Sequence, residues 1–316
     1  MKKSRTLIVD GNNLAARYSH SHQLITSEGK LSGVVFGVMR FLLRFLNRSK
    51  YKYHRVIFAF DSYPKFRHEM YSGYKSQRKV NRKKKESVQI QFEMYRTQVE
   101  YLKEVLPKLG VITAILPEFE ADDLVYKIIQ ALPNEQFTLY SNDQDFVQMV
   151  RKRVVVAKPV HKREIETYIT EKPDYFIIKR ALIGDVSDSI PGVMGIGEVR
   201  AQEIVDLVGE SKLNSFIYNL HKAGKWEEKL RENIDVISLN FKLMSLSYAY
   251  KKFTNVINGA YVEPRFSELG FLKICKEYEL STVMLDKKFY QNVLSVLDTD
   301  IPSEQFETVL SLQDIS

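Results

Sequence analysis

Four short apolar segments, each followed by acidic residues, constrain most strongly how this 316-residue chain can fold. Each is continuously apolar and rich in β-branched and aromatic residues, which is typical of parallel strands buried on both faces. Segments with helical spacing of apolar residues lie between them, at 34–46, 88–109 and 124–132. This alternation predicts an α/β fold with a central, mainly parallel sheet covered by helices. The four segments are residues 6–9, 55–60, 111–116 and 137–140.

The acidic residues after these segments are expected to converge, because the carboxyl ends of parallel strands meet at one edge of a sheet. A further pair, three residues apart, follows a helical segment and fits one face of a helical turn. Taken singly, such acids are equally consistent with helix capping or surface charge. The nine candidates are Asp10, Asp61, Glu120, Asp122, Asp123, Asp143, Asp145, Asp185 and Asp188, of which the first seven are expected at the sheet edge.

Crowded carboxylates repel one another, and divalent cations relieve that repulsion. A ligand set of oxygens, without histidine or cysteine, favours Mg²⁺ over zinc, with Mn²⁺ as a substitute. Two such ions about 4 Å apart activate water and stabilise both the attacking and the leaving oxygen of a phosphodiester. The acids therefore predict metal-dependent phosphodiester hydrolysis.

Residues 64–85 carry nine lysines and arginines against one acid, with Phe66, Tyr71 and Tyr74 interleaved. Basic side chains bind phosphates and aromatic rings stack on unpaired bases, so the segment favours nucleic acid over a merely solvated loop. It begins three residues after Asp61, and we expect it to emerge beside the acidic edge. The net charge of +8 agrees with a polyanionic partner.

A glycine-rich segment at 190–197 lies between two helical patterns, with no strand before it. The missing strand argues against a dinucleotide-binding loop and favours a tight turn between helices. Such a turn lets backbone N–H groups approach a phosphate, and Arg200 in the following helix adds a cation. A purely structural turn is the alternative.

The second half of the chain reads as mainly helical, and we place the boundary between the two parts near residue 180. Domains of 1–180 and 181–316 follow, and the polar residues 298–316 are expected to be loosely attached. Cys275 is the only cysteine, which suggests a reducing compartment, and its surroundings predict a small buried side chain. With no signal sequence or membrane span, we expect a cytoplasmic protein without a membrane partner, and a monomer by default.

Seven motifs, taken in order over residues 7–197, resemble those of the flap endonuclease or 5′–3′ exonuclease family. That family includes phage-encoded 5′ nucleases and the 5′ nuclease domain of bacterial DNA polymerase I, and the length suggests a free-standing nuclease of the phage type. Asn142 stands where the family often has serine or threonine, and Ser189 where asparagine is common. The motifs are Leu7–Asn13, Phe58–Asp61, Phe66–Arg67, Gly73–Lys75, Glu120–Asp123, Asp143–Asp145 and Gly184–Gly197.

The resemblance implies a PIN-like core, a helical arch at about 64–100 and a helix–three-turn–helix motif at about 183–205. It assigns Asp10, Asp61, Glu120, Asp122 and Asp143 to one metal, and Asp145, Asp185 and Asp188 to another, with Asp123 serving either. It gives catalytic roles to Lys75, Arg78 and Asp145, and K⁺ binding to the glycine turn. The DNA contacts it implies are Arg67, Tyr74, Lys75, Arg78, Lys79, Arg82, Gly192, Gly195, Gly197 and Arg200.

The resulting functional prediction is a 5′ nuclease that cuts near 5′ ends at DNA flaps, nicks, single-strand/duplex junctions or RNA primers during replication. RNA–DNA hybrids and replication proteins are further expected partners. Two alternatives stay open: a PIN-type ribonuclease acting on single-stranded RNA, and a junction-binding protein without catalytic activity. The C-terminal hundred residues carry no recognisable motif.

Overall fold

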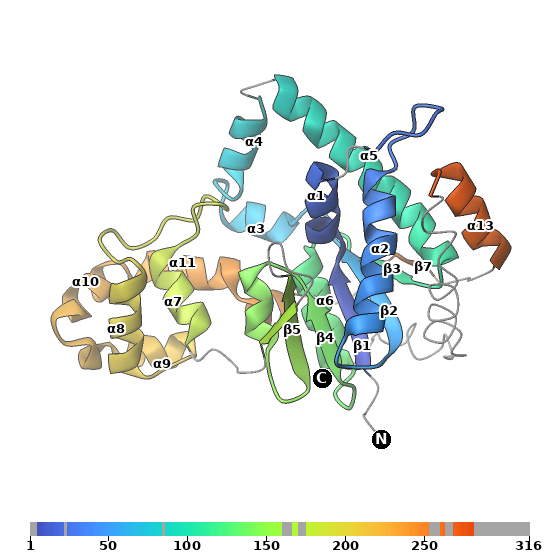
Figure 1. Cartoon of the computed structure of the whole chain (residues 1–316). Coiled ribbons are helices and arrows are strands. Elements are labelled where there is room, and N and C mark those ends of the chain that lie inside the picture. Colours follow the sequence, from blue (N-terminus) through green and yellow to red (C-terminus); the bar gives the residue numbers. More distant parts are fainter. Residues whose placement is uncertain are drawn as a thin grey trace.

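A seven-stranded sheet forms the centre of the computed structural model, which describes residues 5–21, 24–83, 86–159, 166–169, 175–252, 260–262 and 268–280 (Figure 1). The strand order is β6-β5-β4-β1-β2-β3-β7. Neighbours from β5 to β3 pair in parallel, whereas β6 and β7 pair antiparallel at the two edges. The predicted mainly parallel sheet is therefore confirmed. The strands are β1 (Arg5–Asp10), β2 (Tyr53–Phe60), β3 (Ile112–Ile115), β4 (Phe137–Tyr140), β5 (Val154–Pro159), β6 (Glu166–Ile169) and β7 (Ala260–Val262).

Both faces of the sheet are buried, which explains the continuously apolar strands. All six residues of β1 are buried, and successive side chains enter different cores: Leu7 and Val9 one, Ile8 the other. The first core lies under α2 (Gly33–Arg48) and α5 (Glu86–Lys108). The second lies under α6 (Ala121–Ala131). In the register, Ile8 pairs with Ile57 on β2 and with Leu139 on β4.

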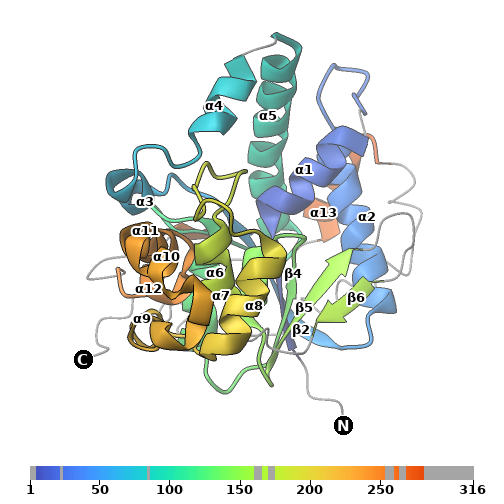
Figure 2. The same cartoon turned by 90° about the vertical axis from the view of Figure 1, so that its left-hand side faces the viewer.

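A helical arch rises from the edge of the sheet where β1 and β2 end. The chain passes through α3 (Lys65–Met70) and α4 (Ser76–Lys83), and α5 returns it to the sheet. Figures 1 and 2 both show α4 and the first part of α5 standing clear of the sheet, with α3 at the foot of α4. The arch predicted at about 64–100 is thus present, next to α1 (Gly11–Ser21).

The helical part has its own core, which includes Ile178, Leu182, Ile204, Phe216 and Leu230. α7 packs against α8 and α11, and the glycine-rich turn joins α7 to α8. Since Ile178 already belongs to this core, helical packing begins slightly before residue 180; the domain boundary stays a prediction. The elements are α7 (Phe176–Ile183), α8 (Glu198–Val208), α9 (Leu213–Tyr218), η2 (Leu220–Trp226), α10 (Glu227–Glu232), α11 (Ile234–Met244) and α12 (Leu246–Tyr250).

Two predictions near the C-terminus fall largely beyond the described part of the chain. Near the end of the predicted helical half, the structure describes α13 (Glu268–Glu277) and residues up to Leu280, where Cys275 is buried as predicted. The polar residues 298–316 lie outside the described residues. Among the described helices, none is both long enough and apolar enough to cross a bilayer.

Candidate functional site

Two neighbouring strands of the sheet, β1 and β2, deliver carboxylates to one place. Asp10 ends β1, and its two oxygens accept hydrogen bonds from the Asn13 N–H (2.9 Å) and the Ser141 hydroxyl (2.9 Å). Asp61 follows β2 and accepts from the Ala121 N–H at 2.9 Å, which joins it to the first turn of α6. Backbone position and hydrogen bonding together fix both side chains.

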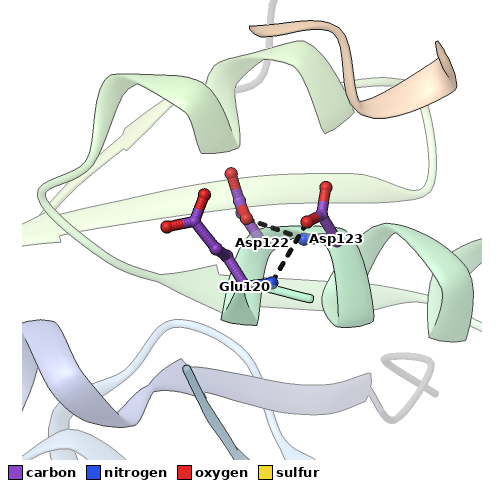
Figure 3. Close-up of side chains that lie close together, drawn as sticks. All are labelled: Glu120, Asp122 and Asp123. Atoms are coloured by element: carbon purple, nitrogen blue, oxygen red, sulfur yellow. Dashed lines mark hydrogen bonds between the residues drawn. The ribbon is translucent and has the colours of Figure 1, made fainter. Parts of the chain in front are cut away.

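The first turn of α6 contributes a compact acidic group (Figure 3). Ligand oxygens of Glu120, Asp122 and Asp123 lie within 4.8 Å of one another. Glu120 caps the helix, and the Asp123 side chain accepts a hydrogen bond from the Glu120 N–H at 3.1 Å. Glu120, Asp122 and Asp123 lie close together because all three belong to the start of α6.

Asp123 has a buried cationic partner, Arg67 on α3. Arg67 Nη2 donates to Asp123 Oδ1 at 2.7 Å, Nη1 donates to the other oxygen, and Nε donates to the Leu243 carbonyl at 2.9 Å. Only 2% of Arg67 and 0% of Asp123 is exposed. The DNA contact of Arg67 stays a prediction; in this structure its guanidinium is buried and binds Asp123 and the Leu243 carbonyl. Both Asp123 oxygens accept hydrogen bonds in this structure, and its role as a metal ligand stays a prediction.

Tyr74 and Lys75 lie at the foot of the arch, against the same carboxylates. The Tyr74 hydroxyl donates to Glu120 Oε2 at 2.7 Å, and its ring is 3% exposed. The DNA contact of Tyr74 also stays a prediction, and in this structure the side chain is buried against Glu120. Lys75 forms an ion pair with Glu120, and its Nζ lies 3.7 Å from Asp188 Oδ2.

The remaining four acids lie in two places. Asp143 and Asp145 lie at the start of η1 (Gln144–Met149), and Asp185 and Asp188 lie in the loop after α7. The Asp145 N–H donates to Asp143 Oδ1 at 2.9 Å. Asp185 pairs with Arg180, and Asp188 pairs with Arg78. Asp188 also accepts from the Tyr74 hydroxyl at 3.3 Å, so its contacts reach the group at α6. The two acidic groups predicted from the sequence are neighbours in space.

Crowding and burial perturb these carboxyl groups. Burial, with the charges of Asp61 and Asp143, raises the pKa of Asp10 to about 7. Burial, with the charge of Asp143, raises the pKa of Asp145 to about 7. Glu120 behaves differently: burial opposes its ionisation, but the Lys75 and Arg67 cations hold its pKa at about 2. Carboxylates that resist ionisation together fit a site that binds divalent cations.

The glycine-rich segment forms the predicted turn between α7 and α8, and its backbone packs closely against the end of α7. Gly184 has φ of +76°, and a Cβ on Gly192 would lie 1.9 Å from the Ile183 carbonyl oxygen. Gly195 has φ of +80°, and its carbonyl accepts from Arg200 Nη1. Any side chain at 192 would displace the backbone, so this position requires glycine. The side chains of Lys79 and Arg82 lie outside the described part of α4.

Three supporting side chains were missed by the sequence prediction. Ser141 fixes Asp10, the Asn12 side chain accepts from the Asp61 N–H at 2.8 Å, and Arg180 pairs with Asp185. Ser141 directly follows β4. Its position at the end of a strand was the one local feature that could have predicted a place in the site. Arg180 lies at the end of α7, five residues before Asp185, and this closeness in sequence was the local signal for the pair.

A parallel sheet with carboxylates at its edge, a cationic arch above and a helical part beside it is the architecture of a nuclease fold, and sequence comparison gives the family. Residues 5–176 match the 5′–3′ exonuclease N-terminal resolvase-like domain, and residues 171–257 match the 5′–3′ exonuclease C-terminal SAM fold. The chain belongs to the 5′–3′ exonuclease family, as the sequence predicted.

Individual relatives agree. A thermostable DNA polymerase I of Thermus aquaticus is 32% identical over 250 residues, 76% of this chain and 28% of that protein. The chain thus spans a little over a quarter of that polymerase. A 5′–3′ exonuclease of Aquifex aeolicus is 28% identical, covering 76% of this chain and 80% of that protein.

Solved structures share the fold. The bacteriophage T5 D15 flap endonuclease, in a complex with DNA and metal ions, has a TM-score of 0.61 at 19% identity. The alignment covers 93% of this chain and 100% of that one. A T5 5′-exonuclease with bound zinc has a TM-score of 0.63 at 21% identity, covering 88% and 100% of the two chains.

Proposed function

We propose that this chain is a two-metal 5′ nuclease that hydrolyses phosphodiesters near the 5′ ends of DNA flaps, nicks and single-strand/duplex junctions. RNA primers paired with DNA belong to the same substrate class. One observation carries the proposal: carboxylates from β1, β2, α6, η1 and the loop after α7 converge directly beneath a cationic arch. Family membership and the T5 nuclease complex with DNA and metal ions support it.

The acids fall into two ligand groups in this proposal. Asp10, Asp61, Glu120, Asp122 and Asp143 would hold one Mg²⁺, and Asp145, Asp185 and Asp188 the other, with Mn²⁺ as a substitute. Bound ions would supply activated water and charge stabilisation for the two reacting oxygens. Asp123 is assigned a different role: with both oxygens on Arg67, it holds the turn from which Glu120 and Asp122 project.

Lys75 and Arg78 are the proposed phosphate contacts. Each is paired with a carboxylate of the site, Lys75 with Glu120 and Arg78 with Asp188. A scissile phosphate beside those carboxylates therefore lies within reach of both cations without movement of the arch. Their positive charge orients the phosphate and stabilises the charge that develops on it during hydrolysis.

Duplex DNA would be held at the glycine turn. The backbone around Gly192, Gly195 and Gly197 leads into the N-terminus of α8, where N–H groups attract phosphate. Backbone carbonyls of the same turn are the proposed ligands of a K⁺ ion. A single strand would pass beneath α4 and α5 to reach the acidic site.

Cleavage of a 5′-labelled flap DNA, with and without Mg²⁺, tests the proposal. A cut near the junction that requires Mg²⁺ is expected, whereas unstructured RNA of the same length should be cut poorly. Preferred cleavage of the RNA would instead support the single-strand ribonuclease. Tight flap binding without any cleavage in Mg²⁺ or Mn²⁺ would support the junction-binding protein.

A further inference from the structure

One aromatic side chain near the proposed metal centre has no role in the function so far. Tyr63 lies two residues after Asp61 and is 58% exposed. Its ring stacks on the His68 ring with centroids 4.7 Å apart and an angle of 6° between the planes. His68 therefore covers one face of the Tyr63 ring and holds it in a defined orientation.

The loop that carries Tyr63 is fixed by backbone hydrogen bonds. The Ser62 N–H donates to the Phe119 carbonyl at 3.0 Å, and the Lys65 N–H donates to Tyr63 O (2.9 Å) and to Glu118 O (3.2 Å). These bonds tie the loop to the segment directly before Glu120. An exposed ring on a fixed loop loses little conformational freedom when it binds a ligand.

A series of aromatic contacts connects this ring with the acidic site. The His68 ring also meets Tyr74 edge-on, with centroids 5.5 Å apart and an angle of 75°. The Tyr74 hydroxyl in turn donates to Glu120 at 2.7 Å. The Tyr63 ring contacts His68, the His68 ring contacts Tyr74, and Tyr74 binds the proposed metal ligand Glu120. Tyr63 directly precedes the Pro64 cap of α3 in the chain, and α3 lies at the foot of the arch (Figure 2).

We propose that Tyr63, backed by His68, is a stacking platform for an unpaired base of the substrate strand close to the scissile phosphate. The identification of the strand rests on the proposed function. An aromatic face accepts every base and needs no hydrogen-bond readout, which suits a nuclease that selects structure over sequence. Lys65, two residues after Tyr63 and paired with Glu118 at 3.0 Å, supplies a cation on the same loop for the accompanying phosphate.

The test measures base stacking without cleavage. A flap DNA with 2-aminopurine at successive positions around the junction is bound in Ca²⁺, and fluorescence quenching and affinity are recorded for Tyr63→Ala and Tyr63→Phe. If Tyr63 stacks on a base, 2-aminopurine fluorescence should be strongly quenched at one or two adjacent positions. Tyr63→Ala should lose this quenching and bind the flap roughly tenfold more weakly, whereas Tyr63→Phe should keep both the quenching and the affinity. Tyr218→Ala, which removes an 80% exposed tyrosine from α9, is the control and should change neither.

An abasic site at the quenched position provides the second arm. If Tyr63 stacks on that base, wild type and Tyr63→Ala should bind the abasic flap equally. An unchanged affinity in Tyr63→Ala, or the same loss on intact and abasic flaps, would overturn the platform. Thermal unfolding of each variant shows whether the fold is intact. If wild type cut no flap in Mg²⁺, the proposed function would fail, whereas the stacking measurement in Ca²⁺ would still give its own answer.

Discussion

Arg67 shows how a buried cation can organise the carboxylates of an acidic site. Its guanidinium neutralises Asp123, and Nη1 also lies 3.3 Å from Glu120 Oε2. Charge-assisted bonds to a planar guanidinium fix both distance and direction. A lysine would keep the charge but lose the paired geometry, and with it the orientation of the first turn of α6.

Arg67→Ala is expected to lower the free energy of unfolding by about 3–5 kcal/mol, because it leaves the buried Asp123 carboxylate without its cationic partner. Denaturant unfolding measures the change. The control is Arg231→Ala, which removes the exposed pair with Glu227 on α10 and should cost at most about 0.5 kcal/mol. Equal losses in the two variants would mean that Arg67 contributes no more than a surface cation.

Asp145→Asn tests a single proposed metal ligand. The carboxylate lies among other acids, and an amide of the same shape removes its charge. Cleavage of flap DNA in Mg²⁺ should fall by at least about 100-fold, since a bound ion contributes several kcal/mol to the transition state. Flap binding in Ca²⁺ should change by less than about threefold. Asp235→Asn, on α11, should leave both properties intact, and full cleavage by Asp145→Asn would remove Asp145 from the site.

The raised pKa values of Asp10 and Asp145, both about 7, set a pH dependence. Both lie above the unfolded value of about 3.9, so between about pH 4 and 7 the folded state binds more protons than the unfolded state. Without divalent ions, the free energy of unfolding should therefore fall as pH rises through 7. Adding Mg²⁺ at pH 8 should restore it, and Mg²⁺ affinity should increase from pH 6 to pH 8. Denaturant unfolding and calorimetry across this range measure both, and a metal-free stability that rises with pH would contradict the assignment.

At the level of elements, the sequence predicted what local patterns determine. The strands from β1 to β4 were visible because burial on both faces requires continuous apolar runs. The sequence prediction missed three strands, the parallel strand β5 and the antiparallel edge strands β6 and β7. β6 and β7 have only 4 and 3 residues, which is too short for a clear pattern. The burial of Arg67 and Tyr74 was also missed: their segment is strongly basic, and their partners lie at least 46 residues away in sequence.

The glycine turn between α7 and α8 gives an element-level prediction. Gly192→Ala places a Cβ against the Ile183 carbonyl. The backbone of Ile183 cannot move aside as easily as a flexible side chain could. The free energy of unfolding should fall by about 1–3 kcal/mol or more, and binding to duplex DNA should weaken with it. Gly197→Ala is the matched control, because a Cβ there meets nothing within 4 Å. Equal stability of the two variants would show that the turn tolerates displacement.

Across the whole molecule, the arch, the sheet edge and the helical part meet through a few hydrogen bonds. The Lys75 N–H donates to Asp188 O at 2.7 Å, Arg78 Nε donates to Ser187 O at 3.1 Å, and Arg67 Nε reaches Leu243 O on α11. Each bond spans more than 100 residues of sequence, which no local pattern encodes. These contacts place cations from the arch next to acids from both other parts.

The salt dependence of DNA binding tests whether Arg78 contacts a phosphate. The side chain is 44% exposed, pairs with Asp188 and is proposed to contact a phosphate. Each phosphate contact releases counterions, so losing one should reduce the slope of log affinity against log salt by about 0.9. Flap binding by Arg78→Ala in Ca²⁺, from low to moderate KCl, gives this slope. The control is Arg44→Ala, which should keep the wild-type slope. Arg44 is exposed on α2, which covers the opposite face of the sheet from α6. If both variants kept that slope, the positive charge of Arg78 would serve only to hold Asp188, and the arch would meet the substrate through other side chains.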